Sequence, residues 1–102
     1  LVEHITHYID THVSSLRSLS EIGDALTYNY SYLSSRYKQI TGQKIKDYYN
    51  KRRMDEAKRL LGTRAYSISG VAERLGYSGV YAFSKAFKAY YKMPPSELFK
   101  NK

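Results

Sequence analysis

The chain has 102 residues, of which 42% are hydrophobic, and it contains no cysteine and no apolar run long enough to cross a membrane. This composition suits one small folded domain, or two very small ones, and it excludes a disulfide framework and a thiolate metal site. The net charge of +8 is uneven, because residues 1–35 hold one basic and four acidic residues whereas residues 36–102 hold sixteen basic and five acidic residues. The resulting charges of −3 and +11 predict a polyanionic partner, with nucleic acid favoured over an acidic membrane surface.

The apolar residues recur at spacings of three and four and never alternate as in strands, so the sequence predicts an all-α chain of about seven helices. The first three helices are expected over 1–13, up to Leu26 and from Tyr30 to Ile40. Ser18 or Ser20 should cap the second helix. Gly42 suits the end of the third, where a left-handed residue is common.

The second half begins with the longest predicted helix, over 44–61, which should end at Gly62. Its buried stripe is expected to comprise Ile45, Tyr48, Tyr49, Ala57, Leu60 and Leu61. Two further helices are expected from Ser67 or Ser69 to Leu75 and over Val80–Tyr91. The adjacent prolines Pro94 and Pro95 should begin a short last helix, because proline is tolerated in a first turn.

One pattern occurs twice in the chain. "LSEIGDALTYN" (19–29) matches "ISGVAERLGYS" (68–78), and "YLSSRYK" (32–38) matches "AFSKAFK" (82–88). The offset of 49 becomes 50 because the second copy has one extra residue in its turn. A short helix, a tight turn and a second helix make a helix-turn-helix unit, in which a small residue, Gly23 or Ala72, permits the close crossing. Gly76 suits the second turn, and Thr27 is a weaker match in the first.

The repeat divides the chain into two helix-turn-helix subdomains, 1–43 and 63–102, joined by a linking helix over 44–62. A helix of about 18 residues is roughly 27 Å long. Successive major grooves on one face of B-DNA are about 34–36 Å apart. The linking helix could therefore hold two recognition helices about one DNA turn apart within a single chain.

The second helix of each unit presents short polar groups and flat rings on its outer face, of the kind that read base edges in a major groove. These outer residues are Tyr30, Ser31, Ser34 and Ser35 in the first copy, and Val80, Tyr81, Ser84 and Lys85 in the second. Basic residues around them are suited to phosphates. They are Arg36, Lys38, Lys44, Lys46, Lys85, Lys88 and Lys92.

Two segments, "YLSSRYKQITGQKIKDYYNKRRMDEAKRLL" and "ISGVAERLGYSGVYAFSKAFKAYYKMPPSEL", resemble the DNA-binding domain of AraC/XylS-type transcription regulators. The resemblance covers essentially all of 1–100 and implies seven helices, two helix-turn-helix units and asymmetric sites that span two successive major grooves. It implies base contacts from Tyr30, Ser31, Ser34, Ser35, Val80, Tyr81 and Lys85. We expect phosphate contacts from Asn29, Arg36, Lys38, Lys44, Ser78 and Lys88. Arg53 matches an arginine of the family's long helix, with either a structural, backbone-orienting role or a phosphate contact.

Four departures from the family pattern bear on these expectations. Gly23 replaces an alanine, which should loosen the first unit's helix by about 0.5–1 kcal/mol. Arg36 replaces an apolar residue, so either its stem packs while its head reaches solvent, or the helix is rotated. Lys92 replaces a glycine, which would cost about 1 kcal/mol if the backbone is left-handed there. Ser34 and Ser35 are shorter than the usual side chains, so the first unit should read bases weakly, and the second unit or DNA shape should contribute more of the specificity.

The sequence therefore predicts sequence-specific binding of double-stranded DNA for transcription regulation in the bacterial cytoplasm, in association with the nucleoid. The resemblance implies activation through RNA polymerase. It also implies an effector or dimerisation domain before Leu1, which we expect to be missing from this chain. An RNA-binding module and a protein-interaction domain that keeps the fold without specific DNA binding are the alternatives.

No enzymatic activity, metal or cofactor is expected. His4, His7 and His12 lie on the first predicted helix, but no cysteine or suitably placed carboxylate completes a set of metal ligands. No Ser/His/acid set and no phosphate-cradling glycine loop is recognisable. The tyrosines at 48, 49, 90 and 91 are expected to be core residues with a polar tip rather than base-stacking platforms.

Overall fold

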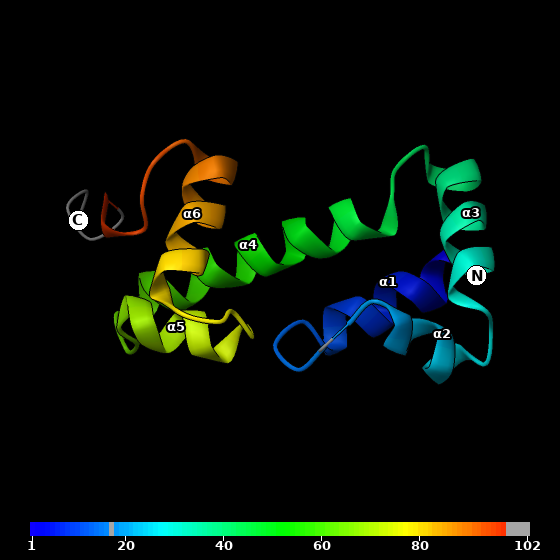
Figure 1. The fold of residues 1–102 in the computed structure, drawn as a ribbon, viewed down its shortest axis with the longest axis horizontal. Coiled ribbons are helices and arrows are strands. Elements are labelled where there is room, and N and C mark those ends of the chain that lie inside the picture. Colours follow the sequence, from blue (N-terminus) through cyan, green and yellow to red (C-terminus); the bar gives the residue numbers. More distant parts are fainter. Residues whose placement is uncertain (17, 98–102) are drawn as a thin grey trace. The chain divides into compact units, whose positions relative to one another are not determined.

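The computed structural model describes residues 1–16 and 18–97, and within them it contains six helices and no strand (Figure 1). The helices are α1 (Val2–Thr11), α2 (Ser20–Leu26), α3 (Tyr30–Thr41), α4 (Ile45–Thr63), α5 (Ile68–Arg74) and α6 (Val80–Tyr91). The all-α prediction is confirmed. The predicted last helix would extend into residues 98–102, which lie outside the described residues. None of the described helices is both long and apolar enough to cross a membrane.

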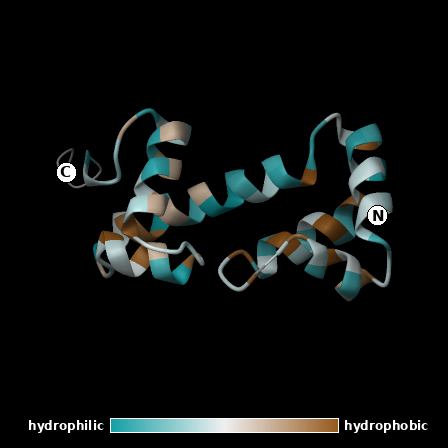
Figure 2. Cartoon of the chain, viewed as in Figure 1, coloured by the Kyte–Doolittle hydropathy of each residue, from teal (hydrophilic) through white to brown (hydrophobic). Residues whose placement is uncertain are grey.

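The chain divides into two compact units, Leu1–Arg52 and Arg53–Lys102. In the first unit α2 packs against both α1 and α3, and in the second α5 packs against α6 (Figure 1). Figure 2 shows hydrophobic and hydrophilic residues alternating around the helices, as expected of amphipathic helices on small cores. The first core comprises Ile5, Ile9, Leu16, Ile22, Leu33, Tyr37 and Ile45. The second comprises Met54, Ala57, Leu60, Leu61, Val71, Ala72, Leu75, Phe83 and Phe87.

The long helix α4 contributes residues to both cores. Ile45 is buried in the first unit, and Met54, Ala57, Leu60 and Leu61 are buried in the second. Met54 was missing from the predicted stripe, and Tyr48 and Tyr49 are only half-buried against the first core.

Two predicted helix ends differ from the structure. Neither Ser18 nor Ser20 caps α2, because their hydroxyls bond each other at 2.8 Å and the carbonyl oxygens of Ser18 and Leu19 accept the first free N–H groups. Helix α4 continues through Gly62 to Thr63, and the left-handed residue after it is Arg64, with φ 60°. Ser67 does cap α5, as predicted, since its Oγ accepts from the Gly70 N–H at 2.9 Å.

An equivalent backbone hydrogen bond closes the first helix of each helix-turn-helix unit. The Tyr28 N–H donates to the Gly23 carbonyl at 2.9 Å, and the Tyr77 N–H donates to the Ala72 carbonyl at 3.0 Å. The repeat recognised in the sequence is therefore a repeat of backbone geometry as well.

Each unit has two corresponding left-handed backbone positions, and in each unit only one of them is a glycine. After α2 the left-handed residue is Thr27, with φ 60°, and after α5 it is Gly76, with φ 81°. After the recognition helix it is Gly42 in the first unit and Lys92 in the second, with φ 78° and 66°. The backbone at Lys92 is thus left-handed, which is the condition under which we expect the replacement of glycine by lysine to cost about 1 kcal/mol.

Replacing Thr27 by glycine is expected to stabilise the first unit by about 0.5–1 kcal/mol, because a β-branched residue is strained in a left-handed conformation. The matched change Gly76→Thr should destabilise the second unit by more than about 1 kcal/mol. Urea unfolding followed by circular dichroism measures both changes. If Thr27→Gly instead lowered stability, the 2.6 Å bond from the Thr27 hydroxyl to the Leu26 carbonyl would have to outweigh the strain.

Candidate nucleic-acid interface

Asn29 precedes α3 and is its N-cap, with an extended backbone. The Asn29 Oδ1 accepts from the Ser31 N–H at 2.8 Å. Asparagine is among the strongest N-cap residues because it satisfies one of the free N–H groups of the first turn. Its side-chain oxygen is therefore engaged within the protein, and the amide NH₂ group is what it can offer to a phosphate.

Helix α3 buries Leu33 and Tyr37. The opposite side of the helix is exposed and is formed by Ser31, Ser35, Lys38 and Gln39. Among the predicted base contacts, Ser31 and Ser35 thus face outward, and Tyr30 and Ser34 lie half-buried beside the core. Burial raises the pKa of Tyr30, and a hydrogen bond with Ser34 opposes that rise.

Arg36 is exposed, and its Nη1 donates to the Gln39 Oε1 at 3.2 Å. Because Leu33 and Tyr37 remain fully buried, the helix is not rotated to bury position 36. Gln39 was missed by the sequence reasoning. It could have been found from the helical period, since it follows Ser35 by four residues on the outward side.

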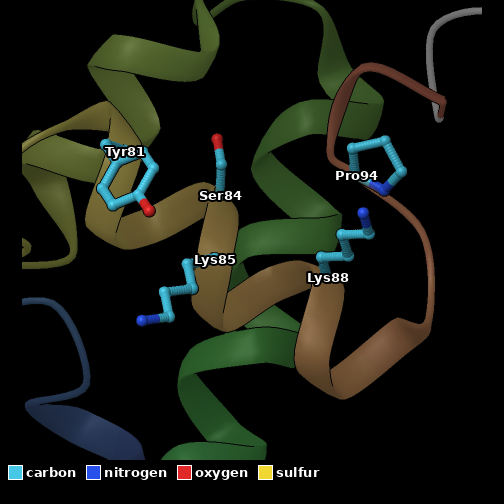
Figure 3. Close-up of a pocket in the computed structure, with 5 residues that line it drawn as sticks. All are labelled: Tyr81, Ser84, Lys85, Lys88 and Pro94. Atoms are coloured by element: carbon cyan, nitrogen blue, oxygen red, sulfur yellow. The ribbon is translucent and has the colours of Figure 1, made fainter.

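Helix α6 repeats this division with different chemistry. Phe83 and Phe87 are buried, whereas Tyr81 is 79% exposed and Val80 45% exposed. Lys85 and Lys88 are exposed on the outward side together with Tyr81. A pocket of about 310 Å³ on this helix is lined by Tyr81, Ser84, Lys85, Lys88 and Pro94 (Figure 3).

The remaining predicted phosphate contacts, Lys44 and Ser78, are also exposed. Lys44 precedes α4, and its carbonyl accepts from the N–H groups of Asp47 and Tyr48. Ser78 lies in the turn before α6. Lys44 is therefore accessible to a ligand of the first unit, and Ser78 to a ligand of the second.

Arg53 lies inside the second unit and orients its turn. Its Nη2 donates to the Leu75 carbonyl at 3.0 Å, and its guanidinium carbon lies 3.9 Å from the centre of the Tyr77 ring. A planar guanidinium can make both contacts at once, which a lysine could not. This geometry supports the backbone-orienting role for Arg53 over a phosphate contact.

The tyrosines at 48, 49 and 91 connect their helices to other parts of the same fold through their hydroxyl groups. Tyr48 donates to Asp10 at 2.8 Å beside the 2.7 Å ion pair of Asp10 with Arg52. Burial and Asp10 raise the pKa of Tyr48 to about 12. Tyr49 donates to the Leu16 carbonyl and Tyr91 to the Met54 carbonyl.

These contacts confirm the structural role predicted for the tyrosines at 48, 49 and 91, whereas the prediction for Tyr90 is wrong, because Tyr90 is 38% exposed. The histidines offer no comparable cluster for a metal. Across residues 1–16 and 18–97, no group of three His, Cys, Asp or Glu side chains could hold a metal ion.

Comparison with known proteins identifies this architecture. Residues 22–101 match the family described as "Helix-turn-helix domain". The C-terminal domain of AraT, a response regulator from Geobacillus stearothermophilus, superimposes with a TM-score of 0.88 at 31% identity, over 99% of this chain and 84% of that one.

The chain covers different shares of two relatives. The Msm operon regulatory protein of Streptococcus mutans is 37% identical over 85% of this chain and 31% of its own length. The multiple antibiotic resistance protein MarA of Salmonella typhimurium is 27% identical over 92% of this chain and 74% of its own length. With its two helix-turn-helix units and these matches, the chain belongs to the AraC/XylS-type family of helix-turn-helix DNA-binding domains.

Proposed function

We propose that this chain binds double-stranded DNA sequence-specifically to regulate transcription, with α3 and α6 entering successive major grooves of an asymmetric site. The observation that carries the proposal is the pair of equivalent helices, each burying two large residues and exposing hydrogen-bonding, aromatic or cationic side chains on its other side. The Msm operon regulatory protein, by its name a regulator, supports this role. Residues 36–102, with sixteen basic residues, add the charge that a polyanion requires.

The base contacts of this proposal come from the outer side of the two recognition helices, and the phosphate contacts from the residues that surround them. The proposed base contacts are Tyr30, Ser31, Ser34, Ser35, Val80, Tyr81 and Lys85. The proposed phosphate contacts are Asn29, Arg36, Lys38, Lys44, Ser78 and Lys88. Tyr30 and Ser34 are half-buried, so their contacts would be made at the edge of the reading surface.

The setting of the domain is also part of the proposal. The longer relatives suggest that an effector or dimerisation domain accompanies it in the full protein. Activation through RNA polymerase, and a place on the bacterial nucleoid in the cytoplasm, follow from the family resemblance. The role is one of binding rather than of catalysis.

Selection of bound sequences from a random duplex pool tests the proposal directly. An asymmetric site of about 16–20 base pairs is expected, because two successive grooves must be covered. If RNA competed better than duplex DNA, an RNA-binding module would replace this function. If no specific complex formed even at low salt, a protein-interaction role would replace it.

On the selected site, Lys85→Ala and Tyr81→Ala are expected to reduce discrimination between bases more than Ser34→Ala does. Lys85 and Tyr81 are exposed, whereas Ser34 is half-buried and short. A good base contact contributes about 1–3 kcal/mol of discrimination. Binding to a panel of single-base variants of the site measures the effect, with circular dichroism as the control for folding. Equal or reversed losses would contradict the unequal reading by the two helices.

A further inference from the structure

The outward side of α6 is apolar at its first turn and cationic beyond it. Val80 is 45% exposed and Tyr81 is 79% exposed, the largest exposed fraction among the large hydrophobic residues of the described chain. Within residues 1–16 and 18–97, the Tyr81 ring stacks on no other ring, and its hydroxyl has no hydrogen-bond partner. Lys85 follows one turn later, on the same side as Tyr81. The protein interior therefore does not account for the placement of these three side chains.

The equivalent side of α3 differs at each of these places. Ser31 stands where α6 has Tyr81, and Ser35 stands where it has Lys85. Hydroxyl groups can donate to or accept from any base, so they discriminate little. The exposed rings of Tyr28 and Tyr32 in this unit stack on each other, with ring centres 5.7 Å apart. The apolar-then-cationic order is therefore present on α6 and not on α3.

The major groove holds one apolar group that can match the first turn of α6, the C5-methyl of thymine. A lysine one turn further can donate to the O6 and N7 acceptors of guanine. Residues four apart are separated by about 6 Å along a helix. That distance is close to two base-pair steps of about 3.4 Å. The pocket bordered by Tyr81 and Lys85 offers room for a base edge between the two side chains (Figure 3).

We propose that Val80 and Tyr81 bind a thymine methyl group and that Lys85 binds a guanine within about two base pairs of it. The inference rests on the proposed function and names the sequence that one of its half-sites contains. The half-site read by α3 does not depend on thymine methyl groups. The DNA target is thus chemically as well as geometrically asymmetric.

The test starts from the site recovered by duplex selection and changes single atoms of the DNA. Each thymine is replaced in turn by deoxyuridine, which lacks the methyl group, and each guanine by 7-deazaguanine, which lacks the N7 acceptor. Deoxyuridine at one thymine, or at either of two adjacent thymines, of a single half-site should lower the affinity about four-fold, which is the effect of one buried methyl group. At one guanine nearby it should fall about five-fold or more.

Variants of the protein assign these effects to side chains. In the double variant Val80→Ala/Tyr81→Ala, the thymine and deoxyuridine duplexes should bind equally. In Lys85→Ala, guanine and 7-deazaguanine should bind equally. Ser31→Ala, at the matching position of α3, should retain both effects.

Insensitivity to methyl removal at every thymine, or a methyl effect that persists in the double variant, would overturn the inference while specific binding remained. Failure to recover any common duplex sequence would instead overturn the proposed function, and this inference with it. The deoxyuridine scan on the unchanged protein decides the matter even if a variant does not fold.

Discussion

Affinity for duplex DNA is expected to fall about 10³- to 10⁵-fold between about 50 and 200 mM salt, because about 6–10 phosphates should be neutralised by lysine and arginine. The basic residues proposed for this role are exposed, among them Lys38 on the outward side of α3, Lys44 before α4 and Lys88 on the outward side of α6. Each neutralised phosphate releases condensed counterions, so the logarithm of affinity should fall linearly with the logarithm of salt, with a slope of about −5 to −9.

Single lysine variants show which side chains contribute to this slope. Lys38→Ala and Lys88→Ala should each make it shallower by about 1 and weaken binding to all sequences alike. Lys58 is the matched control, since its amino group lies 5.3 Å from the centre of the Tyr91 ring and outside the proposed interface. Lys58→Ala should leave the slope unchanged. A slope shallower than about −2 for the unchanged protein would contradict a phosphate-clamping domain.

The fold was predictable where local periodicity controls it. Helix α6 spans Val80–Tyr91, as its pattern of apolar residues predicts. The residues that line the cores of the two units, such as Leu33 and Phe83, are also those that the repeat marks as inward. In these elements the local pattern and the tertiary packing agree, so no information from distant residues was needed.

The sequence pattern does not determine the environment of a residue where a distant partner decides it. Tyr28 and Tyr77 occupy matching places in the repeat, yet Tyr28 is 49% exposed whereas Tyr77 is half-buried with Arg53 over its ring. Arg53 comes from α4, which the second unit uses differently from the first. No local period could show that Tyr77 has this arginine above it and that Tyr28 stacks on Tyr32 instead.

The exposure of the residues in the proposed interface was predictable to a similar degree. The repeat identified the two helices of that proposal, and it separated their buried from their exposed sides correctly at most positions. Tyr30 and Ser34 were placed on the outward side but lie half-buried, and Tyr30 packs against the first core beside the buried Leu33 and Tyr37. Gln39 was omitted although the helical period places it one turn after Ser35 on the exposed side.

Gly23→Ala is expected to destabilise the first unit by about 1–3 kcal/mol, the usual cost of overpacking a tight contact. Helix propensity alone predicts the opposite, a gain of about 1 kcal/mol. The reason is steric: a Cβ atom at position 23 would lie 2.7 Å from the Tyr28 carbonyl oxygen and 3.1 Å from the Tyr30 nitrogen. Both atoms belong to the backbone, so no side chain can move aside. Gly23 therefore permits the close crossing that the sequence predicts, and we expect this steric effect to outweigh the helix propensity that a glycine loses.

The second unit has alanine at the matching position. Ala72 accepts the same closing hydrogen bond from Tyr77, but one extra residue separates Tyr77 from the start of α6. The turn that follows the crossing therefore differs in length between the two units. Ala72→Gly is the matched control and should cost only about 1 kcal/mol through lost helix propensity. Urea unfolding of the two variants decides between the effects: a higher midpoint for Gly23→Ala, with an unchanged slope, would show that propensity outweighs the backbone contact at this crossing.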